Sequence, residues 1–395
     1  MMTLYRSLSI ATAIAAIAFA ALADARPFVP ESDSIVLERL PEAADASLAQ
    51  LKRMRAAAAQ SPGDLALASA VARRSIEASR QTGDPRFLGY AQAALATWWS
   101  AADAPVQALV LRATIKQSRH DFHGALADLD RVLAARPGDA QALLTRASVL
   151  TVQGRYAEAE RDCAKLARRA PPLVVAACAA GPASVSGRAE AAQRELAQAL
   201  ADSADADTGV RAWASTILAE IAARRGDREA AEAHLRAVLA IDPRDAYARG
   251  AYADLLLDAG RPREAAALVA SETRHDALLL RLVLAEAQLP EAAAEYKAAH
   301  RAELTARFYA ARLRGDALHA REESRFRLAI DRDVRVAVEL ARANWDVQRE
   351  PADLRVLVDA ALAADDKAAL ATATEWIRTT RLEDVTLAAR IGERR

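Results

Sequence analysis

The feature that most constrains this chain is a sequence pattern that returns every 34 residues. Two alanines and a proline keep their places, as Ala113, Ala125 and Pro137 and then as Ala147, Ala159 and Pro171. After an irregular unit the pattern returns 72 positions later, in Ala219, Gly226, Ala231 and Pro243, and then 34 positions further on, in Ala253, Gly260 and Ala265. A period of about 34 residues is typical of a helix-turn-helix unit that stacks on its neighbours.

Helix packing explains why these residue types recur. Two antiparallel helices approach to about 8–10 Å only where small side chains occupy the crossing point, which Ala147 and Ala159 supply. Gly154 permits the positive φ that ends a helix, whereas Pro171 cannot continue one. Apolar residues follow the helical period in each unit, so each pair must bury its apolar stripes against the next pair.

The composition agrees with a helical chain. Alanine, leucine, arginine and glutamate dominate, all of them strong helix formers, and aromatic residues make up only 5%. The sequence therefore predicts an all-α fold with almost no strand and with a thin, extended core.

The alanines, glycines and prolines resemble the pattern of the tetratricopeptide repeat family, most clearly from Val106 to Ala270. The resemblance implies a right-handed α-solenoid of stacked antiparallel helix pairs. Segments 83–89, 120–122 and 344–353 are also similar to those of uncharacterised exported bacterial tetratricopeptide proteins. The family's large residue at the fourth position of each unit is replaced, so regular curvature is not implied; the replacements are Leu109, Leu143, Ser215 and Arg249.

The chain divides by sequence into five segments. We expect a signal peptide at 1–23, an extended lead-in at 24–44, degenerate N-terminal repeat-like helices at 45–105, core repeats at 106–280, and C-terminal repeat-like or capping helices at 281–395. The unit between Ala180 and Gly209 is irregular, and a longer turn is expected there. Beyond residue 280 the sequence does not fix the repeat register.

The first 23 residues have the pattern of an export signal. Arg6 precedes an apolar run from Leu8 to Ala23, which ends in small-x-small sites suited to cleavage. The run is somewhat short for a membrane span of about 20 residues, and an uncleaved N-terminal anchor is the alternative. We therefore expect a periplasmic or secreted protein with no membrane span after signal cleavage.

The two cysteines matter because the chain is expected to be exported. Cys163 and Cys178 are 15 positions apart on consecutive predicted helices. They form either a disulfide or a pair of small buried thiols, and they are too few for a zinc site.

Charge and motifs argue against several functional classes. The 53 basic and 53 acidic residues balance, whereas a nucleic-acid-binding protein usually carries a basic excess. The sequence contains no phosphate-binding glycine loop, no His-Glu-x-x-His and no Gly-x-Ser-x-Gly. His120 and His123 are the best metal candidates, but a solvated turn explains them better. We therefore expect no catalytic, cofactor-binding or metal-binding residues, and no enzyme.

The family resemblance also implies a binding face, because the first helix of each unit lines the concave side and faces a bound peptide. The positions concerned carry amides, hydroxyls, acids and two aromatic rings: Gln107, Thr114, Gln117, Gln141, Ser148, Trp213, Thr216, Glu220, Tyr247 and Asp254. Trp213 and Tyr247 are either anchors for a partner or packing residues.

The leading hypothesis is an exported scaffold or adaptor that binds protein or peptide partners in this concave groove without catalysis. It predicts that Trp213→Ala weakens binding and leaves the fold intact. The alternatives are a structural subunit of an envelope assembly and an unrecognised enzyme or metal-binding protein.

Overall fold

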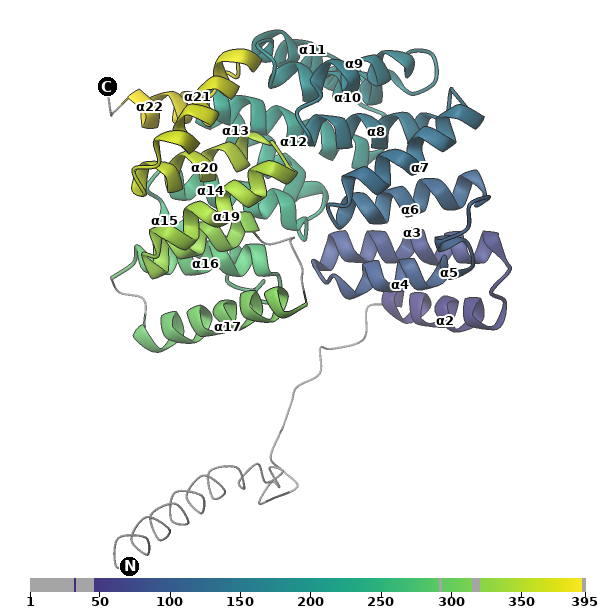
Figure 1. Cartoon of the computed structure of the whole chain (residues 1–395), viewed down its shortest axis with the longest axis horizontal. Coiled ribbons are helices and arrows are strands. Elements are labelled where there is room, and N and C mark those ends of the chain that lie inside the picture. The colour runs from purple at the N-terminus through teal and green to yellow at the C-terminus, as the bar shows by residue number, and fades with distance from the viewer. Residues whose placement is uncertain (1–31, 33–45, 291–292, 315–319, 393–395) are drawn as a thin grey trace, which may run out of the picture. The chain divides into compact units, whose positions relative to one another are not determined.

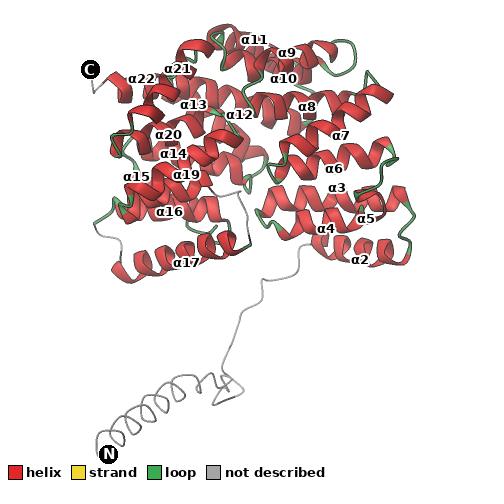
Figure 2. Ribbon diagram, viewed as in Figure 1, coloured by secondary structure: helices red, strands yellow, loops and turns green. Residues whose placement is uncertain are grey.

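A computed structural model describes residues 32, 46–290, 293–314 and 320–392 (Figure 1). Within these ranges the regular structure is helical and no strand occurs (Figure 2). The predicted all-α solenoid is therefore confirmed. The predicted signal peptide at 1–23 lies outside the described residues, as does the predicted lead-in at 24–44 apart from Ser32.

The helices follow one another with short connections. The first are α2 (Ala46–Gln60), α3 (Leu65–Thr82), α4 (Arg86–Ala94), α5 (Ala96–Trp99), α6 (Val106–Ser118), α7 (Phe122–Ala135), α8 (Ala140–Val152) and α9 (Tyr156–Lys165). Next come α10 (Pro172–Ser184), α11 (Ala189–Ala201), α12 (Thr208–Arg225), α13 (Arg228–Ile241), α14 (Ala246–Asp258), α15 (Pro262–Val269) and α16 (Asp276–Ala287). The last are α17 (Ala294–Leu313), α18 (Ala320–Phe326), the π-helix η1 (Arg327–Asp331), α19 (Val334–Val347), α20 (Pro351–Ala363), α21 (Lys367–Thr380) and α22 (Val385–Gly392).

The irregular unit of the sequence is a complete helix pair. Pro182 lies inside α10, and residues 185–188 form a short turn before α11. The acidic segment 202–207 then leads into α12, where Asp207 accepts hydrogen bonds from the amides of Gly209 and Val210. The irregularity therefore changes the spacing of the repeat without interrupting the stack.

Within residues 50–395 the helices form two layers. The first helices of successive pairs pack side by side, from α3 through α6, α8 and α10 to α12, and again from α14 through α16, α18 and α20 to α22. A second helix packs against the first helices of its own pair and of the next, as α7 does against α6 and α8. Because the first helices pack more closely together than the second helices, the stack curves toward them, and they form its inner face.

The small residues lie where the sequence placed them. Ala113, Ala125, Ala147 and Ala159 are all buried in one cluster of side chains. Gly154 has a φ of 75°, which is the left-handed conformation that glycine adopts most easily. The repeat pattern thus marks the crossing points and turns of the helix pairs.

A buried ion pair repeats with the same 34-residue offset. Arg112 on α6 donates from Nε to Asp128 on α7 at 2.7 Å, and Arg146 on α8 donates to Asp162 on α9 at 2.7 Å. Burial alone would raise the pKa of Asp162, but the hydrogen bond and charge of Arg146 lower it below its usual value. Each pair ties a first helix to its second helix.

The two cysteines join consecutive helix pairs. Cys163 on α9 and Cys178 on α10 form a disulfide, with their Cα atoms 5.5 Å apart. The bridge lies inside the buried cluster of the regular repeats.

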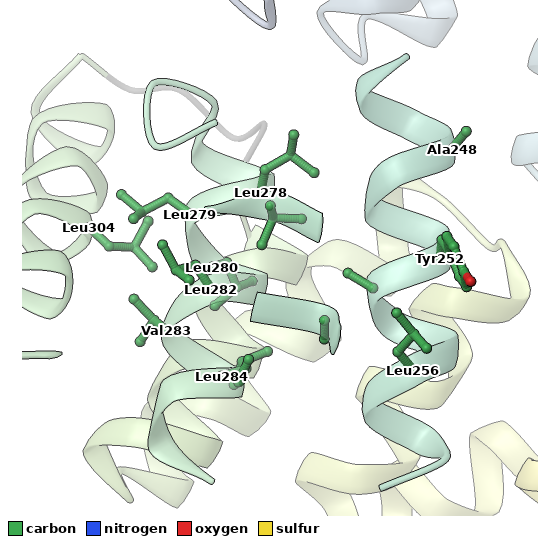
Figure 3. Close-up of a cluster of buried hydrophobic side chains, with 14 of the residues drawn as sticks. Ala248, Tyr252, Leu256, Leu278, Leu279, Leu280, Leu282, Val283, Leu284 and Leu304 are labelled. Atoms are coloured by element: carbon green, nitrogen blue, oxygen red, sulfur yellow. The ribbon is translucent and has the colours of Figure 1, made fainter. Parts of the chain in front are cut away.

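Helix α16 is apolar on almost every side. Its leucines point toward both α14 and α17 in a single cluster, as Figure 3 shows. Such a helix must be covered all round, and α14, α15, α17 and α18 provide that cover.

The last helices return to the middle of the stack. The backbone amide of Arg349 donates to the carbonyl of Val152 at 2.7 Å, and Trp376 lies against the turn at Gly154. Tyr156 and Trp345 each meet the Trp376 ring edge to face, with centroids 6.2 and 5.3 Å away. The C-terminal helices therefore continue as packed pairs and also contact the turn between α8 and α9.

Candidate partner-binding face

The structure places every predicted groove residue on a first helix of the inner layer, namely α6, α8, α12 or α14. Gln107, Gln141, Ser148 and Tyr247 are exposed, and the remaining six are half-buried. They fall into two groups, one on α6 and α8 and one on α12 and α14.

The group on α6 and α8 is polar and largely satisfied by its own helices. The Thr114 hydroxyl donates to the Val110 carbonyl at 3.0 Å, and the Gln141 amide donates to the Thr145 hydroxyl at 3.2 Å. Among the described residues, no hydrogen bond or ion pair joins this group to the residues on α12 and α14. The exposed polar groups of this half of the face are Gln107, Gln141 and Ser148.

Trp213 is a packing residue. It is half-buried and contacts two clusters of buried side chains, one from α6–α10 and one from α10–α12. Truncation would leave a hole between successive helix pairs. We therefore expect Trp213→Ala to lower the stability of the stack, and the expectation that the fold stays intact remains a prediction.

Tyr247 is the exposed aromatic side chain of the face, at 61% exposure. Its hydroxyl donates to the Glu220 carboxylate at 2.5 Å, which fixes the ring between α12 and α14. The negative charge of Glu220 is the main reason that the pKa of Tyr247 is raised well above its usual value, and the surrounding protein and Glu350 add to the effect. The ring is thus open to solvent yet surrounded by protein charges, because it faces the inside of the curve.

Asp254 is held by two arginines. It accepts from Arg281 at 2.6 Å and from Arg325 at 2.7 Å, which ties α14 to both α16 and α18. Burial opposes the ionised form, but the two positive charges outweigh it and hold the pKa of Asp254 far below its usual range. Asp254 is therefore committed to the fold and is not a free group of the groove.

Asp353 is a fully buried carboxylate at the centre of a polar network at the start of α20. Its carboxylate accepts from Arg321 at 3.2 Å and from the Asn344 amide at 2.9 Å, and from the Glu350 backbone amide at 2.9 Å. Burial is the main cause that raises the pKa of Asp353 to about 6, and Arg321 opposes the shift. The network fixes Glu350 at the edge of the inner face.

Sequence reasoning missed the groups that α16, α18 and α20 add to this face: Arg281, Arg321, Glu322, Arg325, Glu350 and Asp353. The one usable signal was the polar cluster from Asn344 to Asp353, where Glu350, Pro351 and Asp353 form a helix start. The other residues lie beyond residue 280, where the sequence did not fix the register. Together with Glu220 and Asp254, the carboxylates outnumber the guanidinium groups five to three.

The metal candidates occupy a turn. His120 has a φ of 59° and stacks on Phe122, while His123 is exposed. In the described part of the chain, no three His, Cys, Asp or Glu side chains are grouped in a way that would hold a metal ion. Across the same residues, no helix has both the length and the apolar character that a membrane span requires.

Comparison with known proteins identifies the repeat. Residues 222–283, which run from the end of α12 to α16, match a family model described as tetratricopeptide repeat. This part of the chain carries tetratricopeptide repeats. Among curated proteins, none matches this sequence.

Solved tetratricopeptide and related helical structures share the architecture. The APC/C hetero-tetramer Cut9-Hcn1 matches with a TM-score of 0.50 and 12% identity over 84% of this chain and 63% of that one. A thermophilic tetratricopeptide protein of Thermus thermophilus matches with a TM-score of 0.38 and 22% identity over 53% of this chain and 100% of that one. A Rap protein complexed with Competence and Sporulation Factor matches with a TM-score of 0.46 and 13% identity over 89% of this chain and 99% of that one. At these identities the likeness concerns the fold alone.

Proposed function

We propose that this chain is an exported scaffold that binds a segment of a protein partner along its inner face, without catalysis. The observation that carries the proposal is Tyr247, a large ring that is 61% exposed on the inner layer and is fixed in place by Glu220. An oriented aromatic side chain provides contact area at a low cost in conformational entropy, which is typical of binding anchors.

The proposal assigns the ten predicted residues unequal roles. Tyr247 and Glu220 contact the partner first, and Gln107, Gln141 and Ser148 extend the contact along α6 and α8. Trp213 and Asp254 support the face from within. The helix pairs give the partner a rigid surface, as expected of a stack in which each pair is packed by its neighbours.

Site-specific photo-crosslinking tests this assignment. A photoreactive phenylalanine analogue replaces Tyr247 on the inner face, and a matched variant carries it at the exposed Ala267 on α15. We expect a defined adduct from position 247 and none from position 267. With the captured partner purified, Tyr247→Ala should weaken binding about 30-fold, as loss of an interface anchor does. Equal adducts from both positions would exclude the inner face as the binding site.

A structural subunit of an envelope assembly is the second candidate. Helix α17 favours it, because Tyr296, Tyr309 and Leu313 are exposed on that helix at 66%, 57% and 71%. Exposed apolar side chains on one element are typical of a protein interface. An adduct from position 309 with none from position 247 would favour this function over the groove.

Export is part of the proposal and has its own test. Fractionation of the native cells, with mass determination of the N-terminus, should find a mature chain that begins after Ala23 or Ala25. An intact Met1 in the membrane fraction would instead indicate an uncleaved anchor.

A further inference from the structure

A cavity of about 540 Å³ lies where the end of α12 meets α21 and α22. Its size falls within the range of about 300–1,000 Å³ that is usual for small-molecule sites. The walls are aliphatic, with no aromatic ring among them: Ile377, Leu382, Val385, Leu387, Ala388 and Ile391. Val385 is 50% exposed although it belongs to the wall, so apolar surface remains open inside the cavity.

Arg224 is the polar group that distinguishes this cavity. Its Nη2 donates to the hydroxyl of the buried Ser184 at 2.9 Å, and that hydroxyl donates in turn to the Gly181 carbonyl at 2.9 Å. The guanidinium is therefore held in one orientation. Its Nε–H is buried and has no hydrogen-bond partner. A buried donor without an acceptor destabilises the fold, so a ligand oxygen that accepts from it would relieve that cost.

The carboxylates around the cavity form no direct ion pair with Arg224, although its charge acts on Asp384 from a longer distance. Among the described residues, none lies within ion-pair distance of this arginine. Asp384 accepts from the backbone amides of Thr386 and Leu387, at 3.0 Å each, and so caps α22. Glu383 accepts from the amide of Ala189 at 3.3 Å. A guanidinium held in one orientation, with no direct ion pair to the described residues, thus lines a cavity whose walls are mostly aliphatic.

The neighbouring Arg225 provides the contrast. It is exposed, and its guanidinium donates to Gln193 at 2.6 Å and lies 3.7 Å from the Glu190 carboxylate. Its charge is therefore already compensated on the surface of α11. Of the two arginines in the lining, Arg225 has a carboxylate within ion-pair distance and Arg224 does not.

We propose that this cavity binds a small monocarboxylate with an aliphatic chain, whose carboxylate accepts from Arg224 while its chain covers the wall formed by α21 and α22. One guanidinium matches one negative charge, and charge-assisted hydrogen bonds to carboxylates are among the strong ones. The aliphatic walls match a flexible chain better than a flat ring. The site lies at the end of α12, apart from Tyr247, and does not depend on the groove function.

Calorimetric titration of the full chain tests the site with decanoate, kept below its micelle concentration. Decyltrimethylammonium, with the same chain length and the opposite charge, is the matched probe. We expect saturable binding of one decanoate per chain and at least tenfold weaker binding of the cation. Equal affinity for the two probes would overturn the proposal, since the arginine would then contribute nothing.

Two substitutions separate the site from the fold. Arg224→Gln keeps a side chain that can bond to Ser184 but removes the charge, and it should weaken decanoate binding at least tenfold. Arg225→Gln should change it less than twofold. Val385→Asn changes a half-exposed wall residue and should weaken binding even if Arg224→Gln folds poorly. Unchanged binding in Val385→Asn, with helicity intact by circular dichroism, would contradict the assignment.

The source of the carboxylate is tested separately. A short peptide that ends in leucine also carries a carboxylate next to an aliphatic side chain. The same peptide with a C-terminal amide lacks the carboxylate. Decanoate should bind more tightly than the peptide acid. Tighter binding of the peptide acid than of decanoate would overturn the assignment to a free aliphatic acid.

Discussion

The helix pairs α6–α7 and α8–α9 differ from the region α18–α20 in how they bury polar groups. In the regular pairs, one arginine of the first helix meets one aspartate of the second helix, 16 residues later in each case. In the C-terminal region, Asp353 gathers Arg321 from α18, Asn344 from α19 and the amide of Glu350. The first arrangement is local and repeated, and the second connects three helices once.

The difference shows what each region requires of the sequence. A local pair survives if two positions keep their residue types, so it can be copied with the repeat. A network around one carboxylate leaves several donors unsatisfied when any member changes, so it specifies a single arrangement at a single place. The regular pairs therefore supply the stack, and the C-terminal network fixes where the inner face ends.

Asp353→Ala should have the largest effect of the three changes that test this comparison. Asp353 is fully buried, and its loss removes the acceptor of the Asn344 amide and one of the acceptors of Arg321. We expect a loss of about 3–5 kcal/mol in the free energy of unfolding, measured by urea denaturation. The exposed Asp346→Ala should change it by less than about 0.5 kcal/mol. Similar values for the two variants would mean that the network adds nothing to stability.

Ala159→Leu tests the crossing point of a regular pair. Ala159 is fully buried against α8, and three extra carbon atoms overpack that contact. We expect a loss of about 1–3 kcal/mol by urea denaturation. Ala157→Leu, two residues earlier on the exposed side of α9, is the control and should be nearly neutral. If Ala159→Leu were as stable as the control, the crossing would not need a small residue.

Asp254→Asn should have the smallest effect, and the effect should depend on pH. The two arginines lower the pKa of Asp254 below its ordinary value of 3.8, so its stabilising contribution is present above about pH 4 and is lost as the pH falls further. We expect the substitution to cost about 1–2 kcal/mol at pH 7, since the side chain remains 27% exposed, and to cost less at pH 3, where part of the contribution is lost. Urea midpoints at the two pH values measure this. An equal cost at both would show that the charge of Asp254 is not what joins α14 to α18.

Much of the regular region could be predicted from the sequence, because its contacts are close along the chain. Ala113 and Ala125 recur 34 residues later as Ala147 and Ala159, and all four pack in one buried cluster. Gly154 lies in the turn between two helices with a positive φ. The recurrence of Arg112 with Asp128 and of Arg146 with Asp162 has the same offset and is therefore also present in the sequence. The inner face was less predictable, because half-buried Trp213 and exposed Tyr247 look alike in sequence.

The sequence by itself determined the helix pairs, their crossing points and their turns, since each depends on residues within one 34-residue unit. Only the tertiary structure decided which distant units meet. Asp254 and Arg325 are 71 residues apart and form an ion pair, and the Arg349 amide binds the carbonyl of Val152 on α8. Small rotations between successive pairs add up along a curved stack, so the position of the last helices depends on all the pairs before them and on no single local motif.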